Sequence, residues 1–161
     1  MAINYRDYDG EKDVLLDFVN KLEEYVKPLD PIHRVKNFEG YADLSLKEML
    51  ENAEKYNGKI LLAEDAGKVI GCAIGAIWNQ SEKNRLEIGL HKLGEILFIY
   101  IDEEYRGQGI GKTMLQMMEN YFKENGCDSV WIVVFSPNEN AHNMYKNFGF
   151  MDREIGMLKQ I

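Results

Sequence analysis

Cysteine is scarce in this chain, and long apolar runs are missing. The 161 residues include 2 cysteines, Cys72 and Cys127, which lie far apart and form no C-x-x-C pair. This excludes a disulfide framework and gives no indication of a zinc site. The longest nearly unbroken apolar stretch, Val69 to Trp78, is well short of the roughly 18 residues that a membrane span requires.

The beginning of the chain lacks a targeting segment. Residues 1–13 are acidic and contain no apolar core of the kind found in secretory signals. We therefore expect a cytoplasmic protein with no membrane partner. The chain also lacks repeats, low-complexity tracts and linkers, and it is long enough to bury a core of its own. We expect one domain over residues 1–161.

Basic residues are fewer than acidic residues in this chain. The chain carries 19 Lys and Arg against 27 Asp and Glu, a net charge of −8. Nucleic-acid-binding proteins need a basic surface, so the balance argues against that class. It suits a cationic substrate, but it also fits an ordinary acidic surface.

The most informative stretch is a strand, a glycine-rich turn and a helix. The apolar run Ile96–Ile101 is rich in β-branched and aromatic residues, which predicts a buried strand. The pair Asn125-Gly126 ends the helix that follows. Apolar residues recur along that helix at three- and four-residue spacing: Ile110, Met114, Met117, Met118, Tyr121 and Phe122.

The turn between this strand and helix is suited to a phosphate. The first N–H groups of a helix have no intrahelical partner, and the helix dipole adds partial positive charge there. Gly107, Gly109 and Gly111 have no Cβ to obstruct an anion, and Arg106 adds a cation. The turn therefore resembles a phosphate-binding loop, although an ordinary glycine-rich turn would have the same outline.

The spacing of the glycines distinguishes between known phosphate loops. Counted from Gly107, the dinucleotide pattern G-x-G-x-x-G fails because its third glycine comes one residue early. Gly111-Lys112-Thr113 matches the end of a P-loop, but Arg106 stands where its first glycine is required. The pattern that fits is R-x-x-G-x-G after a strand.

The remaining segments predict further strands and helices around this unit. Predicted strands are Ile3–Tyr5, Lys59–Asp65, Lys68–Trp78, Ser129–Phe135 and a final strand or short hairpin within Phe150–Ile161. Predicted helices are Glu11–Lys27, a helix opened by a capping box at Ser45 and closed at Asn57-Gly58, and one opened by Ser136-Pro137 and ending near Asn147. Residues 27–39 and 79–94 are expected to be loops. The fold class is α/β (α+β), a mixed sheet covered by helices.

A second pattern lies in residues 138–150, which match N-x-x-A-x-x-x-Y-x-x-x-G-F. The matching positions are Asn138, Ala141, Tyr145, Gly149 and Phe150. Ala141 and Tyr145 share one helical face, which leaves room for a narrow molecule that ends at a hydroxyl. Without a family pattern, the spacing favours Tyr145 as a core residue next to Phe148.

Together, the two patterns resemble the GNAT superfamily of acetyl-CoA-dependent N-acetyltransferases. The resemblance covers nearly the whole chain. It implies a central mixed, mostly antiparallel sheet with splayed central strands, flanked by four helices. It also implies acetyl-CoA as cosubstrate and no metal.

The resemblance further implies where the coenzyme binds. The pyrophosphate would lie on Arg106, Gly107, Gln108, Gly109, Ile110, Gly111 and Lys112. Pantetheine would run between the splayed strands, against the backbone of Ile99, Tyr100 and Ile101, with Asn138 and Ala141 beside it.

The implied reaction is direct attack of a primary amine on the thioester in a ternary complex. Tyr145 would protonate the leaving thiolate. Glu95 is the candidate base because it shares strand parity with Leu97, Ile99 and Ile101. Alternatively, Glu95 marks only the point where the strand meets solvent.

The acceptor carries no sequence signature. The short C-terminal segment favours a small-molecule amine and suggests possible homodimer contacts. A protein N-terminal or lysine acetyltransferase and a non-catalytic acyl-CoA-sensing module remain the alternatives.

Overall fold

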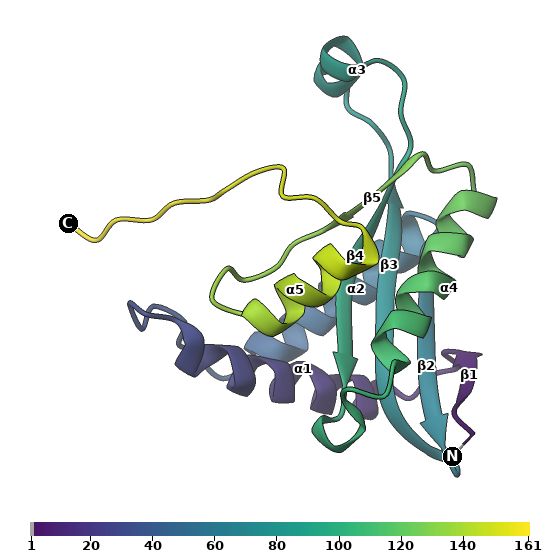
Figure 1. Ribbon diagram of the computed structural model, residues 1–161, viewed down its shortest axis with the longest axis vertical. Helices are drawn as coiled ribbons and strands as arrows, with labels where there is room; N and C mark the ends of the chain where they lie inside the picture. Colours follow the sequence, from purple (N-terminus) through teal and green to yellow (C-terminus); the bar gives the residue numbers. More distant parts are fainter. Residues whose placement is uncertain (1) are drawn as a thin grey trace.

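The computed structural model describes residues 2–161 and shows one sheet between helices (Figure 1). Its strands follow the order β1-β2-β3-β4-β5, with bounds Asn4–Asp7, Lys59–Asp65, Lys68–Trp78, Leu93–Ile101 and Ser129–Ile132. The helices α1 to α5 span Lys12–Val26, Tyr41–Lys55, Glu82–Ile88, Ile110–Glu124 and Glu139–Phe148. The strands β1 to β4 pair antiparallel and β5 pairs parallel to β4, which confirms the predicted mixed, mostly antiparallel sheet.

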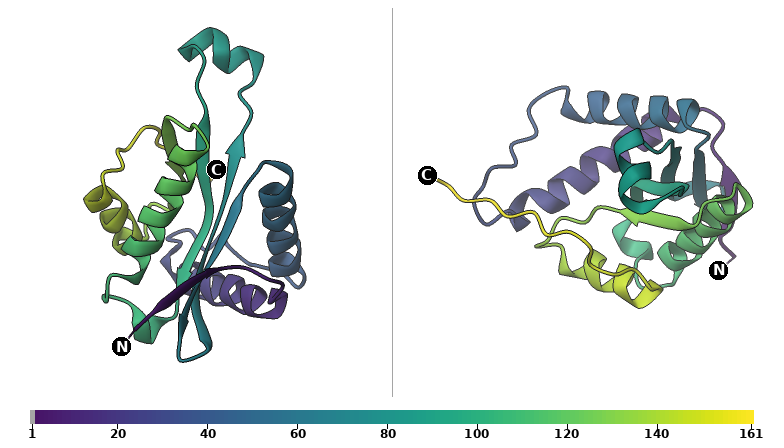
Figure 2. Two further views of the ribbon diagram at one scale, coloured as in Figure 1. Left: turned by 90° about the vertical axis from the view of Figure 1, so that its right-hand side faces the viewer. Right: turned by 90° about the horizontal axis from the view of Figure 1, so that it is seen from above.

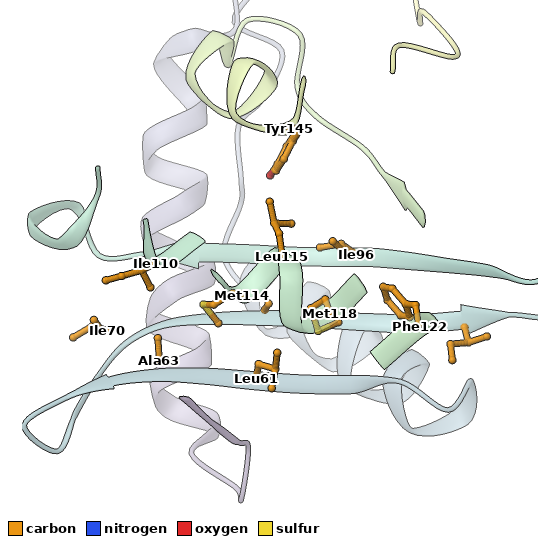
Figure 3. Close-up of a cluster of buried hydrophobic side chains, with 12 residues drawn as sticks. Leu61, Ala63, Ile70, Ile96, Ile110, Met114, Leu115, Met118, Phe122 and Tyr145 are labelled. Carbon is orange, nitrogen blue, oxygen red and sulfur yellow. The ribbon is translucent and has the colours of Figure 1, made fainter. Parts of the chain in front are cut away.

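Each face of the sheet has a hydrophobic core of its own. Helices α1 and α2 cover one face, and α4 and α5 cover the other (Figure 2). The α1/α2 core contains Leu15, Phe18, Val19, Ala42, Leu46, Ala53, Leu62, Cys72, Ile74, Phe98 and Tyr100. The α4/α5 core contains Leu61, Ala63, Ile70, Ala73, Ile77, Ile96, Ile110, Met114, Leu115, Met118, Phe122 and Tyr145 (Figure 3). The apolar stripe predicted for α4 is therefore the face that it buries.

The β2–β3 hairpin closes as the sequence predicts. Ala66 and Gly67 both have positive φ, 48° and 84°, as the two central residues of a type I′ turn require. Gly75 within β3 permits close packing, because a Cβ there would lie 2.4 Å from Met118 Cε and 2.8 Å from Phe122 Cζ.

The helix predicted to open at Ser45 begins one turn earlier. Gly40, with φ 84°, is the N-cap of α2, and the helix starts at Tyr41. The added turn buries Ala42 against α1 and the sheet, so tertiary packing outweighs the local capping pattern. Leu46 and Ala53 are buried on the apolar face of the helix.

The loop predicted over residues 79–94 is wrong in two respects. It contains the short helix α3, whose N-cap Ser81 accepts a hydrogen bond from Asn84 N at 3.2 Å. It also ends early, because β4 starts at Leu93. Helix α3 lies at the tip of the β3–β4 connection, away from the sheet faces (Figure 1). Its exposed Leu86 explains why no amphipathic pattern revealed it.

Near the C-terminus, the end of β5 and the start of α5 also differ from the predicted positions. Strand β5 ends at Ile132, and α5 is capped by Asn138 instead of Ser136-Pro137. Residues 150–161 form neither a strand nor a helix, so the predicted final strand or hairpin is wrong (Figure 1). The apolar side chains of this segment, such as Ile155 and Met157, are exposed.

The close approach of α4 to β4 gives a stability prediction. A Cβ at Gly94 would lie 2.4 to 2.7 Å from ring atoms of the fully buried Phe122. We expect Gly94→Ala to lower the free energy of unfolding by about 1–3 kcal/mol through overpacking, measured by urea denaturation. Gly156→Ala is the control, since a Cβ there meets nothing within 4 Å. Equal stability of the two variants would contradict this packing.

Candidate active site

The candidate site begins where β4 and β5 part. Only Leu93 to Ile96 of β4 pair with β5, opposite Ser129 to Ile132. From Leu97 to Ile101, β4 keeps its partner β3 but has no strand on its other side. The predicted splay of the central strands is therefore present, and it exposes main-chain groups at the predicted Ile99–Ile101 segment.

A β-bulge marks the point of separation. In the β3–β4 ladder, Ile74 pairs with Phe98 but Gly75 pairs with Ile96, so Leu97 is an extra residue in β4. The insertion changes which residues share a face. Ile96 and Ile99 pack in the α4/α5 core, whereas Leu97 and Phe98 both pack in the α1/α2 core.

This bulge corrects the predicted position of Glu95. Simple alternation places Glu95 on the same face as Ile99 and Ile101. Because of the extra residue, those two isoleucines pack toward α4 and α5, whereas Glu95 lies opposite Ile96, on the α1/α2 face. Parity alone could not show this, because a bulge has no reliable local sequence signal.

The glycine-rich turn has the conformation that a phosphate loop requires. After β4, the 3₁₀ turn Glu103–Tyr105 leads into Gly107 and Gly109, with φ of 75° and 82°. Gly109 is the N-cap of α4, and Thr113 N donates the first bond of the helix to Gly109 O at 3.0 Å. The N–H groups of the first helical turn, Ile110 to Lys112, consequently point outward without helical acceptors.

Arg106 folds back over the end of β4. Its Nε donates to Ile101 O at 3.0 Å. Its guanidinium lies 5.1 Å from the ring centroid of Tyr25 and 5.5 Å from that of Tyr100. Within the backbone segment predicted for pantetheine, the Ile101 carbonyl therefore already accepts one hydrogen bond, from Arg106.

Tyr145 reaches the site from α5. Its side chain is 7% exposed, and its hydroxyl is directed toward Leu115 (Figure 3). The ring packs edge-on against Phe150, with centroids 5.9 Å apart. Burial raises the pKa of Tyr145 to about 12, so the phenol keeps its proton at neutral pH. It is therefore available as a proton donor.

Asn138 and Ala141 belong to the same helix end. The Oδ1 of Asn138 accepts a hydrogen bond from Ala141 N at 3.3 Å, which caps α5. The side-chain oxygen of Asn138 therefore caps the helix, and its side-chain amide nitrogen is the group left for a ligand. Ala141 packs at the edge of the α4/α5 core, where a larger side chain would project toward α4.

A groove of about 370 Å³ lies between α4 and α5. Its lining contains Lys112, which was predicted to bind the coenzyme pyrophosphate. It also contains three asparagines for which the sequence suggested no role: Asn140, Asn143 and Asn147. These asparagines are three and four residues apart and therefore lie on one face of α5. That spacing is the sequence signal from which they could have been found. The groove thus adjoins the glycine-rich turn and carries amide donors beside one cation.

Glu95 is partly buried and has one protein donor among residues 2–161, the indole N–H of Trp78, which bonds to Oε2. Burial raises the pKa of Glu95, although the Trp78 hydrogen bond acts in the opposite direction. A carboxylate with a raised pKa is a better proton acceptor than an ordinary surface glutamate.

The structure thus divides the predicted catalytic pair between two faces of the sheet. Tyr145 lies on the α4/α5 face and Glu95 on the α1/α2 face. The β4–β5 pairing ends at Ile96, one residue after Glu95. A thioester lying in the gap between β4 and β5 could meet an acid from one side and an amine with its base from the other.

Neither a metal cluster nor a membrane span is found among the described residues. Residues 2–161 contain no group of three or more His, Cys, Asp or Glu side chains placed to hold a metal ion. Within the same range, no helix is both long and apolar enough to cross a bilayer.

Comparison with known proteins identifies the family. Residues 23–150 match the Acetyltransferase (GNAT) family, and the chain belongs to it. The N-alpha-acetyltransferase of Sulfurisphaera tokodaii is 32% identical over 108 residues, which cover 66% of this chain and 64% of that protein. The spermine/spermidine N(1)-acetyltransferase of Bacillus subtilis is 36% identical over 52 residues, or 32% of this chain and 34% of that protein. The matched region thus spans less than two thirds of these relatives.

A solved structure shows the same fold. A predicted acetyltransferase from Clostridium acetobutylicum, crystallised with acetyl-CoA, superposes with a TM-score of 0.69 at 22% identity. The match covers 99% of this chain and 96% of that one. The GNAT fold predicted from the sequence is confirmed.

The glycine-rich turn gives a binding prediction. Acetyl-CoA at 100 times its dissociation constant should stabilise the fold by about 2.7 kcal/mol, seen as a rise in melting temperature. We expect Gly109→Val to abolish this rise, because a branched side chain beside the exposed N–H groups obstructs the phosphates.

Gly89→Val is the matched control for Gly109→Val. Gly89 also has positive φ, 80°, but it caps the distant helix α3. Its variant should lose stability from backbone strain and still respond to acetyl-CoA. A preserved response in Gly109→Val would remove the turn from the binding site, and a larger response to ATP would favour a nucleotide-binding loop.

Proposed function

We propose that this protein is an acetyl-CoA-dependent N-acetyltransferase, a single catalytic domain that acts on a primary amine, most simply that of a small molecule. One observation carries the proposal: β4 and β5 part after Ile96, with the buried Tyr145 on one face of the sheet and the partly buried Glu95 on the other. Membership of the GNAT family supports acetyl-CoA as the acyl donor. The cytoplasmic location expected from the sequence remains a prediction.

In the proposed reaction the amine nitrogen attacks the thioester carbonyl carbon in a ternary complex. Glu95 accepts a proton from the amine, directly or through a water. As the C–N bond forms and the C–S bond breaks, Tyr145 donates its proton to the sulfur. The products are an N-acetylated amine and the free coenzyme thiol, with both side chains restored by proton exchange with water.

The residues of the turn would hold the coenzyme during this step. The outward N–H groups at the start of α4, together with Lys112 and a displaced Arg106, are suited to a pyrophosphate. The main-chain groups of Ile99 point away from β3 and have no strand partner, so they can bond to the amides of pantetheine as an added strand would, whereas those of Tyr100 face β3. The Asn138 amide would bond to the same arm.

A protein N-terminus is the second candidate acceptor. It is favoured by the name of the Sulfurisphaera tokodaii relative, an N-alpha-acetyltransferase, whereas the Bacillus subtilis relative is named for small polyamines. An assay of acetyl-CoA consumption over small amines and peptides with free N-termini separates them. Binding of acetyl-CoA without turnover of any amine would instead support the acyl-CoA-sensing alternative.

We also propose that the protein forms a homodimer through its C-terminal segment. Met151, Ile155 and Met157 in that segment are each at least 80% exposed, which is unusual for three large apolar side chains close in sequence. Sedimentation velocity should give a dimer, and Ile155→Asp combined with Met157→Asp should give a monomer. A monomeric wild-type protein at micromolar concentration would contradict the proposal.

Tyr145 gives the first kinetic prediction. Tyr145→Phe keeps the ring in the core but removes the proton donor, so kcat should fall by about 10²–10⁴-fold while acetyl-CoA affinity changes little. The control is Tyr121→Phe, which loses a 2.9 Å hydrogen bond to Asn57 O away from the gap. That variant should lose about 1 kcal/mol of stability and keep its kcat. If Tyr145→Phe turns over normally, the residue has only a packing role.

Glu95 gives a pH-dependent prediction. A group whose pKa is raised is ionised, and so acts as a base, only above that raised pKa; wild-type kcat/KM should therefore fall as pH drops through it. Aliphatic amines have pKa values near 10.4, so near pH 7 almost all of the substrate is protonated. Glu95→Gln should depress kcat/KM strongly near neutrality, and the deficit should shrink as pH approaches the pKa of the amine.

The wild-type to Glu95→Gln ratio of kcat/KM, measured from about pH 6.5 to about 9.5, tests this role. A flat ratio near one removes Glu95 from the mechanism. A raised KM for the amine with unchanged kcat would assign the carboxylate to substrate binding alone.

A further inference from the structure

Three side chains on neighbouring strands of the sheet form an indole–carboxylate cluster, defined here as Trp78, Glu95 and Trp131. Trp78 ends β3, and its Nε1 donates to Glu95 Oε2. Trp131 lies directly opposite Glu95 in the β4–β5 ladder and therefore shares its face of the sheet. The carboxylate thus has one indole on each side.

The two indoles differ in how they are held. Trp78 packs on Tyr56 with ring centroids 4.5 Å apart and is fixed further by its bond to Glu95. Trp131 has neither a ring partner nor a hydrogen bond among residues 2–161, and its side chain is only partly buried. Likewise, no protein donor in that range bonds to Glu95 Oε1. The cluster therefore presents a free carboxylate oxygen next to an uncommitted indole face.

An exposed apolar strip continues from the cluster along the chain after β5. Ile132 and Val134 pack inward on the α4/α5 core, whereas Val133 and Phe135, which follow the last residue of β5, lie outside it. Val133 is 71% exposed and Phe135 37% exposed. This strip borders the gap between β4 and β5 and leads away from the carboxylate.

We propose that the indole–carboxylate cluster and the adjoining strip select acceptors that carry their primary ammonium group at the end of an unbranched alkyl chain. The proposal rests on the N-acetyltransferase function proposed above and names its substrate class. The ammonium would bond to Glu95 Oε1 and lie over the Trp131 ring, where charge and ring quadrupole attract it together. The alkyl chain would cover Val133 and Phe135.

This chemistry disfavours other amines. An amino sugar would bring hydroxyl groups against the apolar strip, where few protein groups can replace their bonds to water. An amine with a phosphate or carboxylate close to the nitrogen would place negative charge against Glu95. Selection therefore depends on both the charge next to the carboxylate and the apolar surface that follows.

The composition of the chain provides a direct binding assay. Trp78 and Trp131 are its 2 tryptophans, so intrinsic tryptophan fluorescence reports on this cluster and on nothing else. We expect hexylammonium to change the emission at a concentration at least about tenfold lower than glucosamine does, and hexanoate to have no effect. An equal response to glucosamine would overturn the proposal, and so would a stronger response to a peptide with a free N-terminus.

Variants of Trp131 separate specific binding from a structural role. In enzyme assays, Trp131→Ala should raise the KM for hexylamine about tenfold and leave the KM for acetyl-CoA unchanged. Trp131→Phe should recover most of the loss, because it restores an aromatic face. Leu86→Ala, on the exposed helix α3, is the matched control for loss of a large apolar side chain. An unchanged KM in Trp131→Ala would refute the assignment.

Failure of this proposal can be told apart from failure of the proposed function. Acetylation of glucosamine or a peptide, without a fluorescence response to hexylammonium, would refute the substrate class and leave the N-acetyltransferase standing. A response to hexylammonium whose half-saturating concentration rises in Trp131→Ala, read from the remaining Trp78, with no acetyl transfer to any amine, would confirm the binding site and refute the proposed function. The acetyl-CoA-induced melting shift of Trp131→Ala confirms that this variant is folded.

Discussion

The structure depends on one interruption of hydrogen bonding, the separation of β4 from β5 after Ile96. A sheet normally satisfies both edges of an internal strand, and unpaired main-chain groups are costly unless something else bonds to them. Here the bulge at Leu97 turns β4 just as the partner strand leaves. The result is a central strand with an open edge inside the fold, which a linear molecule bearing amide groups can complete.

The other parts of the site are arranged around that edge. The glycine-rich turn follows β4 directly, so the exposed N–H groups of α4 lie at one end of the gap. Helix α5 brings Tyr145 over β4 from one face, and the bulge turns Glu95 to the other. In the proposed reaction, an acid and a base on opposite sides of a thioester suit a direct transfer, because the amine would approach from the side opposite the acid. The indole–carboxylate cluster lies on the side of this approach.

Much of this could be predicted from local sequence, and the failures have physical causes. The strand–turn–helix unit was recognisable because glycine, capping and apolar spacing act over a few residues, and the Asn138 to Phe150 pattern was recognisable through its resemblance to the GNAT family. The face of the sheet on which Glu95 lies could not be predicted, because pairing with β3 determines where the extra residue, Leu97, is inserted. The start of α2 depends on packing of Ala42, and the short α3 buries no apolar face that a periodic pattern would reveal. The proximity of Trp131 to Glu95 depends on the β4–β5 register, which no single segment encodes.

The central claim is that the coenzyme completes the open edge of β4, and amide hydrogen exchange tests it most directly. Exchange of the backbone amides of Leu97 to Ile101 would be followed by NMR with and without acetyl-CoA. Those amides that face the gap should exchange quickly in the free protein and become protected on binding, while the amides of Leu93 to Ile96 that are already bonded to β5 should change little. Saturation with acetyl-CoA that protects the first turn of α4 but leaves every amide from Leu97 to Ile101 unchanged would contradict the account.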